Sequence, residues 1–111
     1  MKNLSGKRVL ITGGTRGIGA ATAKRFIEEG SRVAILGRDR VAMEAIRKEL
    51  PQLEATFLAD VAIIEDVNRV FTQLDQMWHG LDVLINNPES AFAILSWISH
   101  LRNGRKSWTL T

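Results

Sequence analysis

Residues 12–19 read Thr-Gly-Gly-Thr-Arg-Gly-Ile-Gly, a glycine-rich turn set between a short apolar run and a helix-like stretch. A strand that enters such a turn and continues as a helix is a common way to hold dinucleotide phosphates, because the helix start presents N–H groups and a positive dipole end. Gly13 would allow the tight turn, Gly17 would let an anion approach bare backbone, and Gly19 would let the helix pack closely on a sheet. The alternative is a surface turn that binds nothing.

Strand-like and helix-like segments alternate after this turn. The apolar runs predict strands over residues 7–12, 33–36, 54–59 and 81–85, and the helices between them are expected to end at Gly30, Pro51 and Gly80. Asp39 is placed to cap the second helix. The alternation predicts an α/β fold with right-handed crossovers and a parallel sheet.

Apolar residues at helical spacing predict the buried face of each helix. These residues are Gly19, Ala23, Phe26, Ile27 and Gly30 in the first helix, Ala42, Ala45, Ile46 and Leu50 in the second, and Ile63, Val67, Val70, Phe71, Leu74 and Trp78 in the third.

The spacing Gly-x-x-x-Gly-x-Gly within residues 12–19 resembles the cofactor signature of the short-chain dehydrogenases/reductases, as in the 3-oxoacyl-(acyl-carrier-protein) reductase type. The resemblance covers residues 5–87. It implies the N-terminal half of a Rossmann-type three-layer fold with parallel strand order 3-2-1-4 and a cofactor across the carboxyl ends of the strands. Residues 1–87 are then an NADP-binding half-domain, and residues 88–111 are an atypical tail.

The resemblance also implies which residues contact the cofactor. In the turn they are Gly13, Thr15, Arg16, Gly17, Ile18 and Gly19. At the end of the second strand an acidic residue would hold the ribose 2′-hydroxyl of NAD, but this chain has Gly37 followed by Arg38. Arg16 and Arg38 could together bind a 2′-phosphate, which favours NADP over NAD. Alternatively, both arginines are ordinary solvated side chains.

Two further pairs follow later strands. Asp60-Val61 resembles the family's adenine contact, although Asp60 could instead cap the next helix, or do both. Asn86-Asn87 resembles the first half of the family's Asn-Asn-Ala-Gly motif, which lies beside the cofactor ribose.

The family's catalytic group does not occur in these residues. Its members reduce a carbonyl or oxidise an alcohol with a tyrosine, a lysine four residues later that lowers the tyrosine pKa, and an upstream serine. The 111 residues include no tyrosine, so no catalytic residue is assigned. Two interpretations remain: a truncated NADP-dependent oxidoreductase that binds a dinucleotide without turnover, and a non-enzymatic nucleotide-binding or interaction module.

The tail departs from the family at Pro88-Glu89, where Ala-Gly is expected. Ala-Gly-Ile written GCC GGA ATC becomes Pro-Glu-Ser when its first base is lost, and the shifted tail can then encode a segment similar to the family's. One hypothesis is therefore a lost base in the gene or in its reported sequence. The rival is a genuine C-terminal helix over residues 89–101, with Phe92, Leu95, Ile98 and Ser99 on one side.

Composition excludes several other classes. The net charge is +3, but residues 1–87 carry 12 Lys/Arg against 11 Asp/Glu, and no basic stripe predicts nucleic-acid binding. The absence of cysteine excludes disulfides and thiolate metal sites. The longest apolar stretch, residues 91–98, is too short for a membrane span, so we expect a cytoplasmic protein without a membrane partner. The later helices that form oligomer contacts in the family have no counterpart in these residues.

Overall fold

The computed structural model describes residues 4–13, 15 and 17–86, in which strands and helices alternate. The strands are β1 (Arg8–Thr12), β2 (Arg32–Gly37), β3 (Ala55–Leu58) and β4 (Val83–Asn86). The helices are α1 (Gly17–Glu28), α2 (Arg40–Glu49) and α3 (Ile64–Trp78). All seven elements expected from the sequence are confirmed, with boundaries shifted by a residue or two. The tail interpretations concern residues outside the described part.

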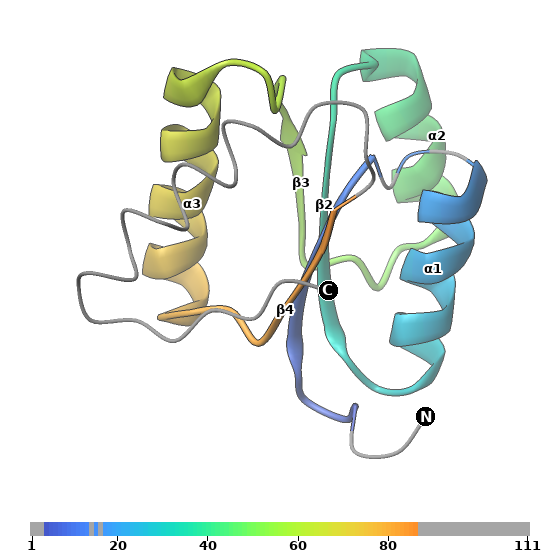
Figure 1. The fold of residues 1–111 in the computed structure, drawn as a ribbon. Coiled ribbons are helices and arrows are strands. Elements are labelled where there is room, and N and C mark those ends of the chain that lie inside the picture. Colours follow the sequence, from blue (N-terminus) through green and yellow to red (C-terminus); the bar gives the residue numbers. More distant parts are fainter. Residues whose placement is uncertain (1–3, 14, 16, 87–111) are drawn as a thin grey trace.

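The four strands form one parallel sheet with the order β3-β2-β1-β4, as predicted. Val9 of β1 lies between Val33 of β2 and Val83 of β4, and Thr12 lies between Leu36 and Asn86. Because all strands run the same way, their carboxyl ends meet at one edge of the sheet, the upper edge in Figure 1. The turns that follow the strands are therefore neighbours in space.

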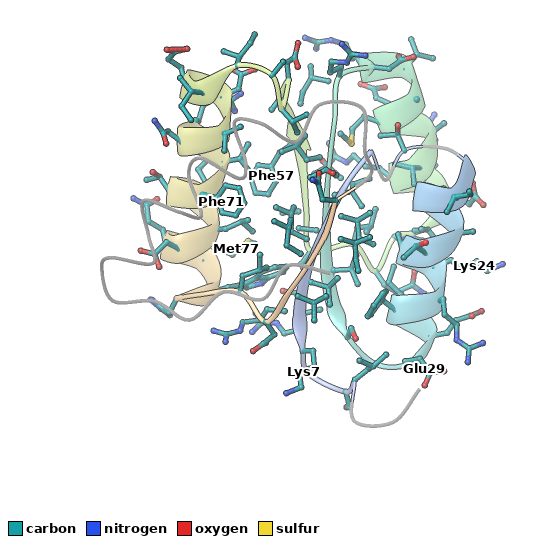
Figure 2. The ribbon with its side chains drawn as sticks, in the orientation of Figure 1. Lys7, Lys24, Glu29, Phe57, Phe71 and Met77 are labelled. Atoms are coloured by element: carbon teal, nitrogen blue, oxygen red, sulfur yellow. The ribbon has the colours of Figure 1, made fainter. Side chains whose placement is uncertain are left out.

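Helices cover both faces of the sheet and create two apolar cores. In Figure 1, α1 and α2 lie on one side and α3 on the other. Figure 2 shows Phe57 and Phe71 between the sheet and α3, where they belong to the core on the α3 side. Lys24 points outward from α1. Alternate residues of β1 serve the two cores: Leu10 packs toward α3, while Val9 and Ile11 pack toward α1 and α2. A strand buried on both faces explains the continuous apolar run.

The predicted buried faces hold at most positions for α1 and α3, although Gly30, after α1, is exposed, and they hold less well for α2. Ala45 is exposed, and Met43, which the sequence analysis did not select, is buried with Ile46 and Leu50. The longer methionine buries more apolar area than an alanine, so the helix turns that side to the sheet. Ile63, predicted as the first inward residue of α3, is 44% exposed because it lies just before the helix.

Local signals fix the helix ends. Asp39 caps α2 as predicted, since its carboxylate accepts hydrogen bonds from the backbone N–H groups of Val41 and Ala42. Gly30 follows α1 with φ of +88°. The third helix, α3, ends at Trp78, two residues before the predicted stop at Gly80; His79 has a left-handed φ of +60°, and Gly80 follows with φ of +146°. Within the described residues, no helix is both long and apolar enough to cross a membrane.

Candidate functional site

The glycine-rich turn connects β1 to α1 at the carboxyl edge of the sheet. Gly13 has φ of +71°, and its N–H donates a hydrogen bond of 2.7 Å to the carbonyl of Leu36, which fixes the turn to the end of β2. Gly17 begins α1 with φ of +60°, and nothing lies within 4 Å of the place where a β-carbon would be. Both glycines therefore adopt a conformation that other residues avoid. At Gly17 the backbone also borders open space.

The first turn of α1 is suited to an anion. It carries no acidic side chain, so no carboxylate offsets the partial positive charge of the helix start. Ile18 is 82% exposed there, whereas Gly19 is buried against the sheet side. The burial of Gly19 agrees with its expected packing role. Arg16, predicted to contact a 2′-phosphate, lies outside the described residues.

The end of β2 places a cation beside this turn. Gly37 is buried and is the last residue of the strand, and the next residue, Arg38, has 66% of its side chain exposed. Its Nη1 atom lies 3.9 Å from Oδ2 of Asp60, which follows β3. The structure thus brings together two of the predicted residues, from the ends of adjacent strands.

Asp60 is held by a small network of its own. Its Oδ1 accepts a hydrogen bond of 2.9 Å from the N–H of Ala62, and its own N–H donates one of 2.9 Å to Oδ2 of Asp66. The alternative that Asp60 caps α3 is wrong, because Ile63 is the N-cap residue and makes no side-chain capping bond. Asp60 instead closes a turn before the helix. Val61 is partly buried against the core under α3.

Asn86 is fixed at the end of β4 by its neighbour on β1. The hydroxyl of Thr12, which is only 1% exposed, donates a hydrogen bond of 2.9 Å to Oδ1 of Asn86. The two residues are register partners, so the bond follows directly from the pairing of β1 with β4. Asn87 lies outside the described residues. Of the predicted site residues, the structure places Gly13, Thr15, Gly17, Ile18, Gly19, Arg38, Asp60, Val61 and Asn86 at one edge of the sheet.

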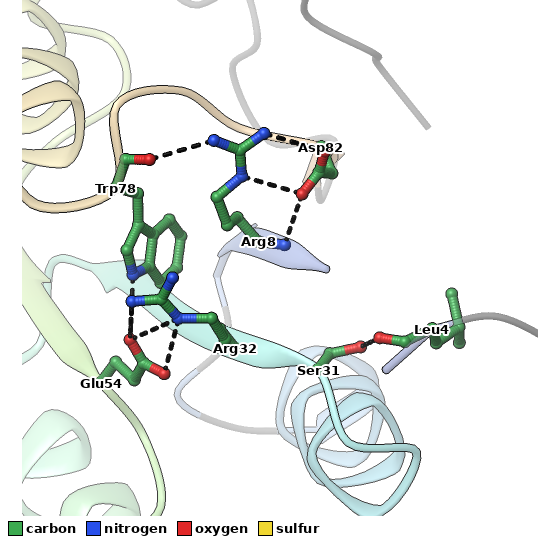
Figure 3. Close-up of polar contacts among 7 residues, drawn as sticks. All are labelled: Leu4, Arg8, Ser31, Arg32, Glu54, Trp78 and Asp82. Carbon is green, nitrogen blue, oxygen red and sulfur yellow. Dashed lines mark hydrogen bonds and ion pairs between the residues drawn. The ribbon is translucent and has the colours of Figure 1, made fainter. Parts of the chain in front are cut away.

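A second polar cluster, at the opposite edge, was not predicted from the sequence. Figure 3 shows Arg8 bonded to Asp82 through its main-chain N–H and its guanidinium, at 2.8 to 3.0 Å, and to the carbonyl of Trp78 at 3.0 Å. Arg32 and the indole N–H of Trp78 both donate to Glu54. Hydrogen bonds from Arg8 lower the pKa of Asp82 to about 2, and those from Arg32 lower the pKa of Glu54.

This amino-edge cluster joins the beginnings of all four strands to the end of α3. Its charged side chains form the ion pairs Arg8–Asp82 and Arg32–Glu54, and the cluster lies at the edge of the sheet away from the glycine turn. We assign it a structural role. In the described part of the chain, no three His, Cys, Asp or Glu side chains gather to hold a metal ion.

A turn with two glycines at positive φ, followed by a helix on a parallel sheet of order 3-2-1-4, agrees with the comparison to known families. The model of the short chain dehydrogenase family matches residues 7–91, slightly beyond the resemblance recognised in the sequence. The chain belongs to the short chain dehydrogenase family. Glucose 1-dehydrogenase of Gluconobacter oxydans is 40% identical over 87 residues, which cover 75% of this chain and 33% of that enzyme.

Solved dehydrogenase structures, one of them a short chain dehydrogenase, have the same fold. One from Bacillus anthracis matches with a TM-score of 0.71 and 36% identity, over 77% of this chain and 35% of the other. Xylitol dehydrogenase with bound NAD+ matches with a TM-score of 0.68 and 32% identity, over 75% of this chain and 33% of the other. The chain spans about a third of the length of the relatives it matches.

Proposed function

We propose that residues 1–87 form the dinucleotide-binding part of a short chain dehydrogenase and that they bind NADP in preference to NAD. The preference depends on one observation at the end of β2. Gly37 brings no carboxylate to this position, and Arg38 brings a largely exposed guanidinium. A carboxylate would accept a hydrogen bond from the 2′-hydroxyl of NAD, whereas a guanidinium donates several to a 2′-phosphate.

The glycine turn fits the pyrophosphate of such a cofactor. The open space beside Gly17 and the lack of an acidic group in the first turn of α1 leave the backbone N–H groups accessible to an anion. In this proposal Gly13, Thr15 and Gly17 shape the turn, Ile18 contributes its exposed backbone and side chain, and Gly19 seats the helix start on the sheet.

The neighbouring strand ends fit the two nucleoside parts. Asp60 is a fixed carboxylate that can accept a hydrogen bond from an adenine amino group, with the backbone of Val61 beside it. Arg38 and Arg16 would hold the 2′-phosphate. Asn86 and Asn87, at the end of β4, would lie beside the other ribose, and the bond from Thr12 keeps the amide of Asn86 in place.

We propose binding without turnover for these residues. A bound nicotinamide supplies or accepts hydride in this family, but the reaction also needs a group that exchanges a proton with the substrate oxygen. The sequence contains no tyrosine to do so.

Titration of the purified full chain with NADPH and NADH, followed by nucleotide fluorescence, tests the proposal. We expect tighter binding of NADPH and no hydride transfer to any carbonyl compound. R38A should weaken NADPH binding by roughly 10- to 100-fold, the range for a lost charged hydrogen bond, and leave NADH binding nearly unchanged.

R40A is the matched control, since Arg40 is an exposed arginine at the first position of α2. It should change neither affinity by more than about twofold. Equal affinities of the wild type for the two nucleotides would refute the preference, and no binding of either would refute the site.

The division at residue 87 is part of the same proposal. We propose that residues 88–111 result from a lost base and do not belong to the family's fold. Sequencing the gene tests this: the shifted reading frame should encode Tyr-x-x-x-Lys downstream. A shifted frame without that pattern would favour the genuine C-terminal helix.

A further inference from the structure

The end of β2 has no room for a side chain. A β-carbon placed on Gly37 would lie 2.9 Å from Cγ2 of Thr15, closer than β-carbons come to other heavy atoms. It would lie 3.5 Å from Oγ1 of Thr15 and 3.6 Å from Cε of Met43, which are ordinary contacts. Gly37 does not have positive φ, so its backbone conformation is open to other residues. The obstacle to a side chain is therefore the methyl group of Thr15.

The fold gives that methyl group little freedom to move away. The hydrogen bond from Gly13 to the carbonyl of Leu36 holds the glycine turn against the end of β2, two residues before Thr15. Threonine is branched at its β-carbon, which restricts rotation about χ1.

We propose that Thr15 determines nucleotide specificity by keeping position 37 free of a side chain. This inference rests on the proposed function. An acidic residue at position 37 would add the carboxylate that binds the 2′-hydroxyl of NAD and would repel a 2′-phosphate. The methyl group of Thr15 occupies the space that a β-carbon at position 37 would need. A single substitution at Gly37 therefore cannot place that carboxylate correctly. Arg38 then remains the group that meets the nucleotide.

The steric part is tested by thermal unfolding of the full chain. G37A should lower Tm by roughly 4–8 °C, a shift that corresponds to a modest packing cost in a domain of this size. In the T15S background, which removes only the methyl group, G37A should lower Tm by less than half as much. T72S is the control, since Thr72 is exposed on α3, and it should not rescue G37A.

The specificity part is tested by titrating four chains, the wild type, T15S, G37D and T15S/G37D, with NADPH and NADH. T15S alone gives the reference affinities with which the double variant is compared. G37D should lose NADPH affinity without gaining NADH affinity, whereas T15S/G37D should bind NADH at least about tenfold more tightly than G37D does.

Two outcomes separate this inference from the function on which it rests. A wild type that binds neither nucleotide refutes the proposed function, and the role of Thr15 in specificity falls with it. A wild type that prefers NADPH, with equal NADH affinities for G37D and T15S/G37D, refutes only the role of Thr15. Equal losses of Tm from G37A in the two backgrounds would refute the steric explanation.

Discussion

Asp82→Asn should destabilise the protein, because Asp82 is the acceptor for the hydrogen bonds that tie Arg8 to the start of β4 in the amino-edge cluster. Its carboxylate accepts three hydrogen bonds from Arg8: from the main-chain N–H at 2.8 Å, from Nε at 2.9 Å and from Nη2 at 3.0 Å. An asparagine has nearly the same shape but offers one acceptor oxygen and no charge. The variant therefore removes the ion pair without opening a cavity.

The lowered pKa of Asp82 sets the size of the expected loss in the free energy of unfolding. Hydrogen bonds from Arg8 lower this pKa from its ordinary value of 3.8 to about 2, against the raising effect of burial. At about 1.4 kcal/mol per pKa unit, the difference corresponds to about 2.5 kcal/mol of stability at neutral pH. The side chain is 28% exposed, so solvent screening reduces this value. We expect D82N to lower the free energy of unfolding by about 1–2 kcal/mol.

The effect should depend on pH in one direction. Because the folded pKa lies below the unfolded pKa, the contribution is fully present above the unfolded value of 3.8 and is lost as pH falls toward about 2. Wild type and D82N should therefore differ by a constant amount at neutral pH and converge in the acid range.

Urea denaturation followed by far-UV circular dichroism measures this difference, since urea does not screen charges. E44Q, which removes a negative charge from an exposed position of α2, is the control and should change stability by less than about 0.5 kcal/mol. If D82N unfolds at the wild-type urea concentration at pH 7, or if its deficit persists unchanged at pH 2, the ion pair does not stabilise the fold as we infer.

Two substitutions at helix ends follow from the same kind of argument. Asp39→Ala removes the cap of α2 and should cost about 0.5–2 kcal/mol in urea denaturation, whereas D39N should cost less because it keeps the acceptor; equal losses would contradict capping. His79→Gly should raise stability by roughly 1 kcal/mol, because a glycine tolerates the φ of +60° at this position, and a decrease would show that the imidazole makes a contact worth more than the strain.

The sequence predicts the elements of this fold well because local patterns and the global arrangement agree. The apolar runs are continuous where the strands are buried on both faces, and Asp39 precedes α2 as a capping residue should. The prediction of the inner face of α2 was partly wrong, because periodicity alone does not show that Met43 is buried and Ala45 exposed. That choice depends on the distance between helix and sheet.

The polar networks depend on contacts that no local pattern contains. Arg8 and Asp82 are 74 residues apart and meet because β1 pairs with β4 and their beginnings coincide. In the same way, the ion pair of Arg38 and Asp60 follows from the adjacent ends of β2 and β3. The motif predicted Asp60 as a site residue, but its bonds to Ala62 and Asp66 required the folded turn. The steric relation of Thr15 to Gly37 was equally invisible in the sequence.

The central claim is that a phosphorylated dinucleotide binds at the carboxyl edge of the sheet. Nuclear magnetic resonance of the 15N-labelled full chain, titrated with NADPH, tests this most directly. The account predicts the largest amide shifts at Gly13, Gly17 and Arg38, and little change in the indole N–H of Trp78 at the opposite edge. Shifts centred on Trp78, or no shifts at saturating NADPH, would contradict it.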